Sequence, residues 1–234
     1  MRLYMVRHAD PDYLSDTITE VGHQEALAVA DRMAKVGLTH LFVSPMGRAR
    51  ATARYTADMI GLEPVVLPWT AELKMTRLSD MTGAEIAPWN VPGELIRGGV
   101  ELPTTQNWHQ YADLAGYDFA GRQAELAAAS DAFLGELGYR RAGGVYAVDA
   151  PNDHAVAIFC HAGFGVSWMA HLLALPLTLA WCGFFWAPTS VTTILMERRS
   201  PDIAVPRALA VGDTSHIHVA GLAESSRGLT ANDR

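Results

Sequence analysis

Short apolar runs that stop abruptly at polar residues are the feature of this sequence that most restricts its fold. Three of them lie at 4–6, 41–43 and 155–160. A continuous apolar run of this length indicates a strand that is buried on both faces of its sheet. A helical pattern of apolar residues lies between Thr19 and Gly37. Because strands that alternate with helices build parallel sheets, the sequence predicts a three-layer α/β/α sandwich with a mostly parallel central sheet.

The starts of the first two helices can be predicted from their capping residues. Thr19 is a typical N-cap for a helix that ends before Gly37. Ser44 is expected to cap the next helix, with Pro45 near its first turn. Arg48 then falls in the first turn, close to free backbone N–H groups and to the positive end of the helix dipole. Both features favour an anion beside Arg48.

The remaining elements and the domain boundaries follow from similar patterns. Further strands are expected at 65–67, 190–196 and 208–211, and an amphipathic helix at 122–137. The stretch from about 74 to 121 is irregular, so we expect an inserted lid there rather than core. The sequence predicts a single domain over residues 1–220, followed by a polar, mobile tail at 221–234.

A long apolar segment at 165–188 approaches the length of a membrane span. Pro176, Gly183 and Pro188 interrupt it, so we expect a buried helix, a turn around Pro176 and a further apolar loop. The sequence therefore predicts no membrane partner. The aromatic residues at 181–186 are open to two interpretations, a homodimer patch or the wall of a pocket.

Composition and charge narrow the class of partner. The net charge of −7 argues against a nucleic-acid partner, although local arginines can still attract an anionic substrate into a pocket. Two cysteines, Cys160 and Cys182, argue against a disulfide framework and favour a reducing compartment. The first residues already form a predicted strand with no cleavable leader before them, so a cytoplasmic location is expected.

Charged and imidazole side chains directly follow three of the predicted strands. Arg7 and His8 follow the first strand. Ser44 and then Arg48 follow the second, and His161 follows the third. A parallel sheet brings the carboxyl ends of its strands together, where ligands bind. Two arginines beside two histidines are difficult to explain as core packing, because buried cations need anionic partners. The simplest such partner is a phosphoryl group, which arginine binds and neutral imidazole can attack.

Two alternatives remain open from the residues alone. In one, Arg7 lies on the surface at a strand end and His8 caps a loop. In the other, imidazoles and carboxylates bind a metal ion; the residues concerned are His8, Asp10, His161, Asp213 and His216. Arg7 and Arg48 count against a metal, because two fixed cations repel a divalent ion. We therefore expect no metal and no cofactor.

Several short motifs share their residues and their order with a known family. They are Arg7-His8, Thr19-x-x-Gly22-x-Gln24-Glu25-Ala26, Ser44-Pro45-x-x-Arg48-Ala49-x-x-Thr52-Ala53, Glu72, His161-Ala162-Gly163 and Gly212-Asp213-Thr214-Ser215-His216. In these residues the chain resembles the histidine phosphatase superfamily, also called phosphoglycerate mutase-like. The matches run from residue 2 to about 217 in the family's order, and only the stretch at about 74–121 lacks a counterpart.

The resemblance implies a two-step reaction at the ends of the strands. Neutral His8 attacks the phosphorus and becomes a phosphohistidine, which water then hydrolyses. Arg7, Arg48 and His161 bind the three equatorial phosphoryl oxygens. Such donors stabilise the charge that moves on the phosphoryl group.

The resemblance also implies that Glu72 is the proton donor, because it directly follows the third strand region as the family's acid does. It gives a proton to the leaving oxygen and later takes one from water, which requires a raised pKa. Glu85 and Asp80, in the same irregular region, are the alternative carboxylates.

The chain departs from the family pattern just after the first histidine. Ala9 stands where a glycine is usual, and the loop from Asp10 to Ser15 lacks an asparagine that many members carry. Tyr13 or Ser15 is expected to replace it. The candidate substrate-binding residues are Asp10, Tyr13, Ser15 and Ala162.

The activity implied by the resemblance is metal-independent hydrolysis of a small-molecule phosphomonoester. Mutase activity is the first alternative, but residues 73–76 do not resemble the segment that follows the acid in the family's mutases. A non-catalytic phospho-ligand binding protein is the second, and the complete set of arginines and histidines argues against it. The lid predicts an apolar or ring-bearing leaving group; the residues concerned are Trp89, Arg97, Trp108, His109 and Tyr111.

Overall fold

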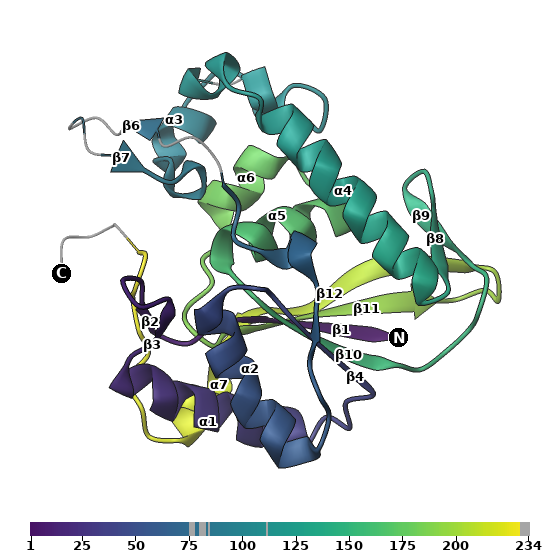
Figure 1. The fold of residues 1–234 in the computed structure, drawn as a ribbon. Helices are drawn as coiled ribbons and strands as arrows, with labels where there is room; N and C mark the ends of the chain where they lie inside the picture. Colours follow the sequence, from purple (N-terminus) through teal and green to yellow (C-terminus); the bar gives the residue numbers. More distant parts are fainter. Residues whose placement is uncertain (75–77, 80–82, 84, 111, 230–234) are drawn as a thin grey trace.

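An eight-stranded mixed sheet runs through the middle of the molecule (Figure 1). The computed structural model describes residues 1–74, 78–79, 83, 85–110 and 112–229. The strand order is β5-β4-β10-β1-β11-β12-β9-β8. The strands are β1 (Arg2–Arg7), β4 (His40–Val43), β5 (Val65–Val66), β8 (Tyr139–Ala142), β9 (Val145–Val148), β10 (Ala155–Cys160), β11 (Val191–Arg198) and β12 (Ile203–Asp213).

β1 joins a parallel part of this sheet to an antiparallel part. It pairs in parallel with β10, which continues to β4 and β5, and it pairs antiparallel with β11. Its side chains alternate between two cores, because Leu3 and Met5 face one hydrophobic cluster and Val6 faces the other. The predicted α/β fold class is confirmed. The hairpin β8–β9 was not predicted, because Arg140 and Arg141 interrupt its apolar pattern.

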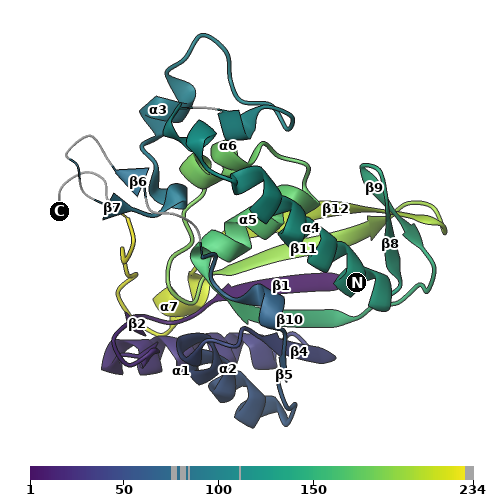
Figure 2. The ribbon, with the colours of Figure 1, turned by 45° about the horizontal axis from the view of Figure 1, so that its top comes forward.

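Helices cover both faces of the sheet, which gives the three predicted layers (Figures 1 and 2). One face carries α1 (Glu20–Ala34), α2 (Gly47–Ile60) and α7 (Ser215–Val219). The other carries α4 (Phe119–Glu136), α5 (Ala162–Leu172) and α6 (Leu177–Gly183). The sheet therefore lies between two apolar layers, and only its strand ends and edges can meet a ligand.

The two predicted helix starts have different outcomes. Thr19 caps α1 as expected, because its side chain accepts the N–H of Gly22. The prediction that Ser44 caps α2 is wrong. That helix begins at Gly47, whose N–H donates instead to Asp16 Oδ2 at 2.7 Å. The cap is supplied by a loop distant in sequence, and the Ser44 hydroxyl oxygen accepts the N–H of Met46, at 3.3 Å, before the helix begins.

The segment predicted as an inserted lid contains short elements above the sheet. They are β6 (Leu78–Ser79), β7 (Glu85–Ile86), α3 (Gly93–Arg97) and 3-10 turns at 88–90, 108–110 and 112–116. Ile96, Trp108 and Leu114 are buried and belong to the larger hydrophobic cluster. The segment therefore contributes to the core as well as overhanging the strand ends. Asp80 and Tyr111, named above, lie outside the described residues.

The long apolar segment forms two helices, α5 and α6. The predicted buried helix and the turn before Pro176 are present, but α6 replaces the expected apolar loop. Leu177, Ala180 and Trp181 recur at helical spacing and are buried. In the part of the chain that the structure describes, no helix is both long and apolar enough to cross a membrane.

The C-terminal tail, which the sequence predicts to be mobile, contacts the body of the molecule in its described part. After α7 the chain passes the small sheet formed by β2 (Pro11–Asp12) and β3 (Thr17–Ile18) (Figure 1). Arg227 Nη2 donates to the Pro11 carbonyl at 3.1 Å, and Arg7 Nη1 donates to the Arg227 carbonyl at 3.2 Å. The tail up to residue 229 is thereby held against the carboxyl end of β1.

Candidate active site

The carboxyl ends of β1, β4 and β10 lie at one edge of the sheet, as the sequence predicts. Cross-strand register aligns Arg7 with Cys160, so the next residues, His8 and His161, meet. Their ring centroids are 5.2 Å apart. The structure therefore brings together side chains that are about 150 positions apart in the chain.

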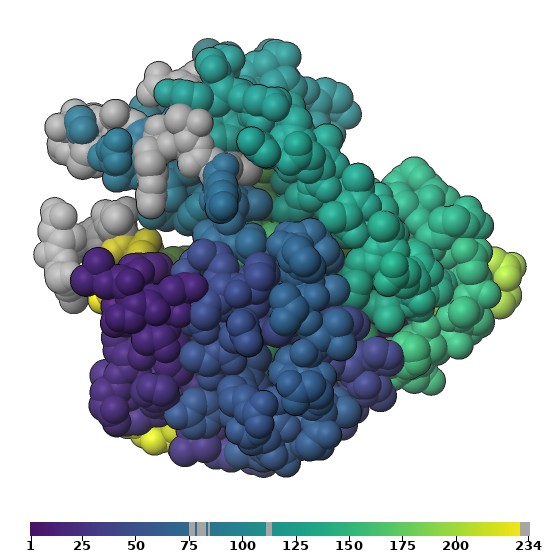
Figure 3. Space-filling model, in the orientation of Figure 1, coloured from purple at the N-terminus to yellow at the C-terminus, as the bar shows by residue number. Residues whose placement is uncertain are grey.

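A pocket of about 930 Å³ opens at this edge. Arg7, His8, Arg48 and Glu72 line one part of it. His161 is fully buried and does not line the pocket, although its ring adjoins that of His8. Figure 3 shows the surface hollowed between the N-terminal body and the overhanging segment that contains α3. The side chains predicted from the strand ends and from the resemblance are thus assembled, with four at the pocket wall and His161 beneath it.

His8 is buried and has a defined tautomer when neutral. Its Nδ1 lies 2.7 Å from the carbonyl oxygen of Ala9, which can only accept, so Nδ1 carries the proton. The lone pair of Nε2 is then available to the pocket. Burial lowers the pKa of His8 well below its usual value, and the charge of Arg7 lowers it further. His8 is therefore a neutral imidazole with an unprotonated nitrogen at physiological pH.

The two arginines at the pocket are buried but differ in their partners. Arg48 Nη1 forms an ion pair with Asp16 Oδ1 at 2.7 Å. Arg7 forms no ion pair with any residue that the structure describes, and its Nη1 donates to the carbonyl of Trp186. The Nε atoms of both guanidinium groups are buried without a hydrogen-bond partner. Two buried cations with spare donors make a strong anion site.

His161 is held by Ser44, the residue wrongly predicted to cap α2. The Ser44 Oγ atom lies 2.7 Å from His161 Nε2, while Nδ1 is buried without a partner. Burial lowers the pKa of His161 to about 2, with further contributions from Arg48 and Arg7. The ring is therefore neutral, and a hydroxyl proton donated to Nε2 places the ring proton on Nδ1.

Glu72 is anchored at the N-terminus of α5. Its Oε1 accepts the N–H of Phe164 at 2.8 Å, and its Oε2 accepts the N–H of Gly163 at 3.2 Å. Burial raises the pKa of Glu72, an effect that these backbone hydrogen bonds oppose. Glu85 is exposed and does not line the pocket, so Glu72 is the carboxylate placed beside His8 among the described candidates.

The structure separates the predicted substrate-binding residues into two pairs. Tyr13 and Ala162 line the pocket, and the guanidinium of Arg48 lies 5.4 Å from the Tyr13 ring centroid. Asp10 and Ser15 do not line the pocket. Asp10 accepts from the Thr19 hydroxyl at 2.8 Å, and the Ser15 N–H points to Asp12, so the loop uses both residues for its own turns.

Asp16 is a site residue that the sequence reasoning missed. Its backbone has a positive φ of 47°, and its carboxylate binds both Arg48 and the N–H of Gly47. A Cβ at Gly47 would lie 2.1 Å from the Asp16 carbonyl oxygen, so only glycine allows this approach. Nothing in the local sequence indicates the contact, because the partners are 31 positions apart.

The C-terminal motif that contains Asp213 and His216 lies next to the loop that contacts His8. Arg32 pairs with Asp213 at 2.7 Å, and His216 Nε2 lies 3.1 Å from the Thr189 hydroxyl. The Thr189 N–H donates to the carbonyl of His8 at 3.3 Å. These residues thus hold the loop beneath the pocket. Across the described ranges, no three His, Cys, Asp or Glu residues are grouped to hold a metal ion.

Sequence comparison relates the chain to phosphoryl-transfer proteins. Residues 3–207 match the model of the histidine phosphatase superfamily (branch 1). The chain is 34% identical over 102 residues to the probable phosphoglycerate mutase GpmB of Erwinia tasmaniensis, covering 38% of this chain and 47% of that protein. It is 32% identical over 84 residues to the protein of the same name in Enterobacter sp. (strain 638), covering 32% and 39%. The chain therefore spans less than half the length of these curated relatives.

Solved structures share the fold over most of the chain. A phosphoserine phosphatase from Entamoeba histolytica, solved with 3-phosphoglyceric acid, aligns with a TM-score of 0.61 at 18% identity, covering 92% of this chain and 98% of that one. A mycobacterial glucosyl-3-phosphoglycerate phosphatase, solved with VO3, aligns with a TM-score of 0.57 at 19% identity, covering 89% and 97%. At such identities the likeness shows the fold. Together with the family model over residues 3–207, the assembled strand ends show that this chain belongs to the histidine phosphatase superfamily.

Proposed function

We propose that this protein is a metal-independent phosphatase that hydrolyses a small-molecule phosphomonoester through a phosphohistidine on His8. The observation that carries this proposal is the neutral His8 ring, whose unprotonated Nε2 is available to a pocket beside two buried guanidinium groups. Arg7 and Arg48 supply the positive charge that attracts the phosphoryl group and neutralises it during transfer.

In the first step, His8 Nε2 attacks phosphorus and the bond from phosphorus to the leaving oxygen breaks. Glu72, in its acid form, donates the proton that this oxygen needs to leave as an alcohol. Arg7 and Arg48 bind two of the remaining oxygens from the pocket wall, and the His161 ring, which adjoins His8 beneath that wall, turns toward the pocket to bind the third. By analogy with oxyanion-hole donors, each contributes about 3 to 4 kcal/mol to lowering the barrier.

In the second step, water attacks phosphorus and the bond to His8 Nε2 breaks. The Glu72 carboxylate takes a proton from the water, which restores its acid form for the next cycle. The raised pKa of Glu72 suits this alternation, because a carboxyl group of ordinary pKa is almost wholly ionised at neutral pH. Inorganic phosphate then leaves the pocket.

Phosphoglycerate mutase activity is the second candidate, and the names of the curated relatives favour it. A mutase returns the phosphoryl group from the histidine to a second hydroxyl, whereas a phosphatase gives it to water. The two activities are separated by supplying 3-phosphoglycerate and measuring 2-phosphoglycerate and inorganic phosphate. The phosphatase proposal predicts inorganic phosphate as the product.

The phosphohistidine is tested by trapping. The protein is mixed with a radiolabelled phosphomonoester in the presence of a chelator and quenched in base, because phosphohistidine is labile in acid. We expect label on a peptide that contains His8, and none in His8→Asn. A folded protein that releases no phosphate and acquires no label is a binding protein, and label retained in His8→Asn contradicts the assignment.

A further inference from the structure

The pocket is far larger than a phosphoryl group. Its volume of about 930 Å³ lies near the upper end for pockets that hold whole small molecules. Arg7, His8, Arg48 and Glu72 account for only one part of the lining. In a phosphatase, the rest of the space is available to the group carried by the leaving oxygen.

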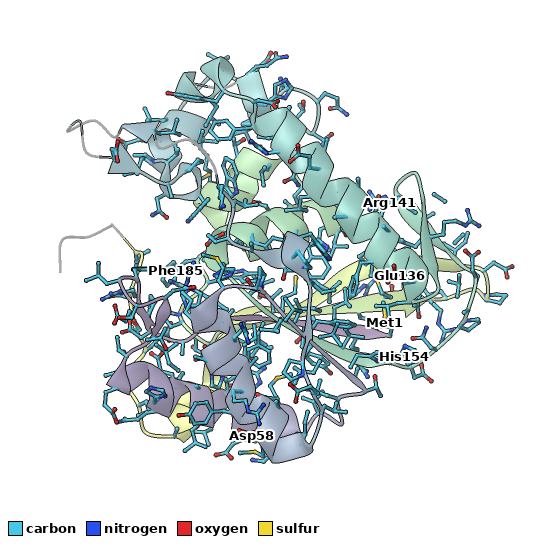
Figure 4. The ribbon with its side chains drawn as sticks, in the orientation of Figure 1. Met1, Asp58, Glu136, Arg141, His154 and Phe185 are labelled. Carbon is cyan, nitrogen blue, oxygen red and sulfur yellow. The ribbon has the colours of Figure 1, made fainter. Side chains whose placement is uncertain are left out.

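Apolar side chains dominate that remaining space. Phe184 and Phe185 are each 37% exposed, and Leu229 of the C-terminal tail is 51% exposed, although all three line the pocket. Phe185 lies between β2 and β3 on one side and the segment that carries α3 on the other (Figure 4). Apolar surface left open in a concave site is surface that an apolar ligand can cover.

A tryptophan places this apolar wall beside the proposed acid. A Cβ at Gly163 would lie 2.6 Å from the Trp89 ring, so the indole packs directly on the first turn of α5. The N–H of the same glycine donates to Glu72. Trp89 and Glu72 both line the pocket. The substituent on a leaving oxygen protonated by Glu72 would therefore lie close to Trp89.

The charges around this space do not suit an anionic leaving group. Beyond the phosphoryl-binding part, the described lining includes two charged side chains, Lys74 and Glu94, one of each sign and both exposed. Arg7 and Arg48 are engaged by the phosphoryl group. Among the described lining residues, Lys74 is then the one cation left for a carboxylate on the leaving group, and Glu94 would repel that carboxylate.

We propose that the leaving group is a large apolar or ring-bearing alcohol that packs against Trp89, Phe184 and Phe185. This inference rests on the proposed phosphatase activity and names its substrate class. Recognition depends on the area of apolar surface covered, whereas phosphoryl transfer depends on the residues at the strand ends.

The test is a series of phosphate esters whose alcohols differ in size but hardly in acidity. Ethyl, butyl, hexyl and octyl phosphates, with 2-phenylethyl phosphate as the ring-bearing member, keep the chemical step constant. We expect kcat/KM to rise by up to about fourfold for each added methylene, the equivalent of about 0.8 kcal/mol. Phosphoserine and 3-phosphoglycerate are expected to be the poorest substrates.

Two variants test which side chains cause the dependence of kcat/KM on chain length. Phe184→Ser with Phe185→Ser is expected to flatten the dependence on chain length, so that kcat/KM on octyl phosphate falls far more than kcat/KM on ethyl phosphate. The matched control is Val219→Ser, which removes an exposed apolar side chain on α7, outside the pocket. It should retain the full dependence. If the double variant does not fold, the ester series on the unaltered protein still shows whether kcat/KM depends on the apolar size of the leaving group.

The outcomes separate this inference from the activity on which it rests. Hydrolysis of all esters with no dependence on chain length, or with the carboxylated esters best, overturns the apolar subsite and leaves the phosphatase intact. Absence of both phosphate release and label on His8 overturns both. A steep dependence that persists in the double variant shows that other side chains make the subsite and contradicts the assignment to the two phenylalanines.

Discussion

Ser44 has a different role in the structure from the one that its position in the sequence predicts. The residue stands where a helix cap is expected, yet its hydroxyl lies 2.7 Å from His161 Nε2. When the Ser44 hydroxyl donates to Nε2, the His161 ring proton lies on Nδ1, and this contact holds the orientation of the ring. In the proposed reaction, Ser44 is therefore a positioning residue that would act on the phosphoryl group through His161.

Ser44→Ala should lower the rate of phosphohistidine formation about tenfold, corresponding to about 1.4 kcal/mol, because a buried ring nitrogen loses its partner. The measurement is kcat/KM together with single-turnover labelling of His8. Ser44→Thr, which keeps the hydroxyl, should recover most of the rate.

The matched control for Ser44 is Ser190→Ala. Ser190 is also fully buried, but its hydroxyl has no hydrogen-bond partner. This variant should keep the rate within about twofold, since no bond is lost. Equal losses in the two alanine variants would mean that Ser44 matters only for packing.

At the scale of elements, the first turn of α2 is organised by the loop that follows β1. Asp16 supplies the missing cap to Gly47 and holds Arg48 with its second carboxylate oxygen. The C-terminal tail approaches the same loop through Arg227, which donates to the Pro11 carbonyl. The loop after β1 thus holds Arg48, while the tail contacts that loop and lines one side of the pocket with Leu229.

Asp16→Ala should raise KM about tenfold with a smaller change in kcat, because Arg48 loses its orientation and α2 loses a cap worth about 1 kcal/mol. The control is Asp58→Ala, which removes an exposed ion pair with Arg54 on the same helix. Such a pair contributes about 0.3 to 0.5 kcal/mol, so its kinetics should not change. An unchanged or lower KM in Asp16→Ala would contradict the positioning role.

At the scale of the whole molecule, folding buries several histidines in their neutral form. Burial lowers the pKa of His8 and His161, and it lowers that of His216 to about 4. The unfolded chain binds protons at these histidines below about pH 6.5, whereas the folded chain does not. The opposite sign applies to Glu25 and Glu72, whose raised pKa values favour the folded state at low pH.

The free energy of unfolding should therefore be greatest above about pH 6.5 and fall as the pH drops toward about 5, by at most about 1.4 kcal/mol per pH unit for each histidine. Urea unfolding at several pH values measures this slope. His216→Gln should reduce it, while His218→Gln, which alters an exposed histidine on the same helix α7, should not. Stability that is flat or increases on acidification would refute this account.

Local patterns in the sequence predicted the elements that carry the site. Short apolar runs indicated β1, β4 and β10, because a strand covered on both faces buries its side chains on both sides and therefore has a continuous apolar sequence. Thr19 predicted the start of α1 because its cap lies within one turn. Arg7, His8, Arg48 and His161 could be named because each lies at the end of a strand or the start of a helix, and strand ends in a parallel sheet converge. Glu72 could be named only from the resemblance to the family.

The sequence by itself determined the layered α/β class and which side chains would gather at the strand ends, because patterns within a few residues define each element and a parallel sheet brings the carboxyl ends of its strands together. Only the tertiary structure decided that Asp16 caps α2, that Ser44 serves His161 and that the tail reaches the pocket. Each of these depends on residues brought together across dozens of positions. The residues around each of these positions do not indicate the hydrogen-bond partner, because the partner is brought into contact only by the folding of the whole chain.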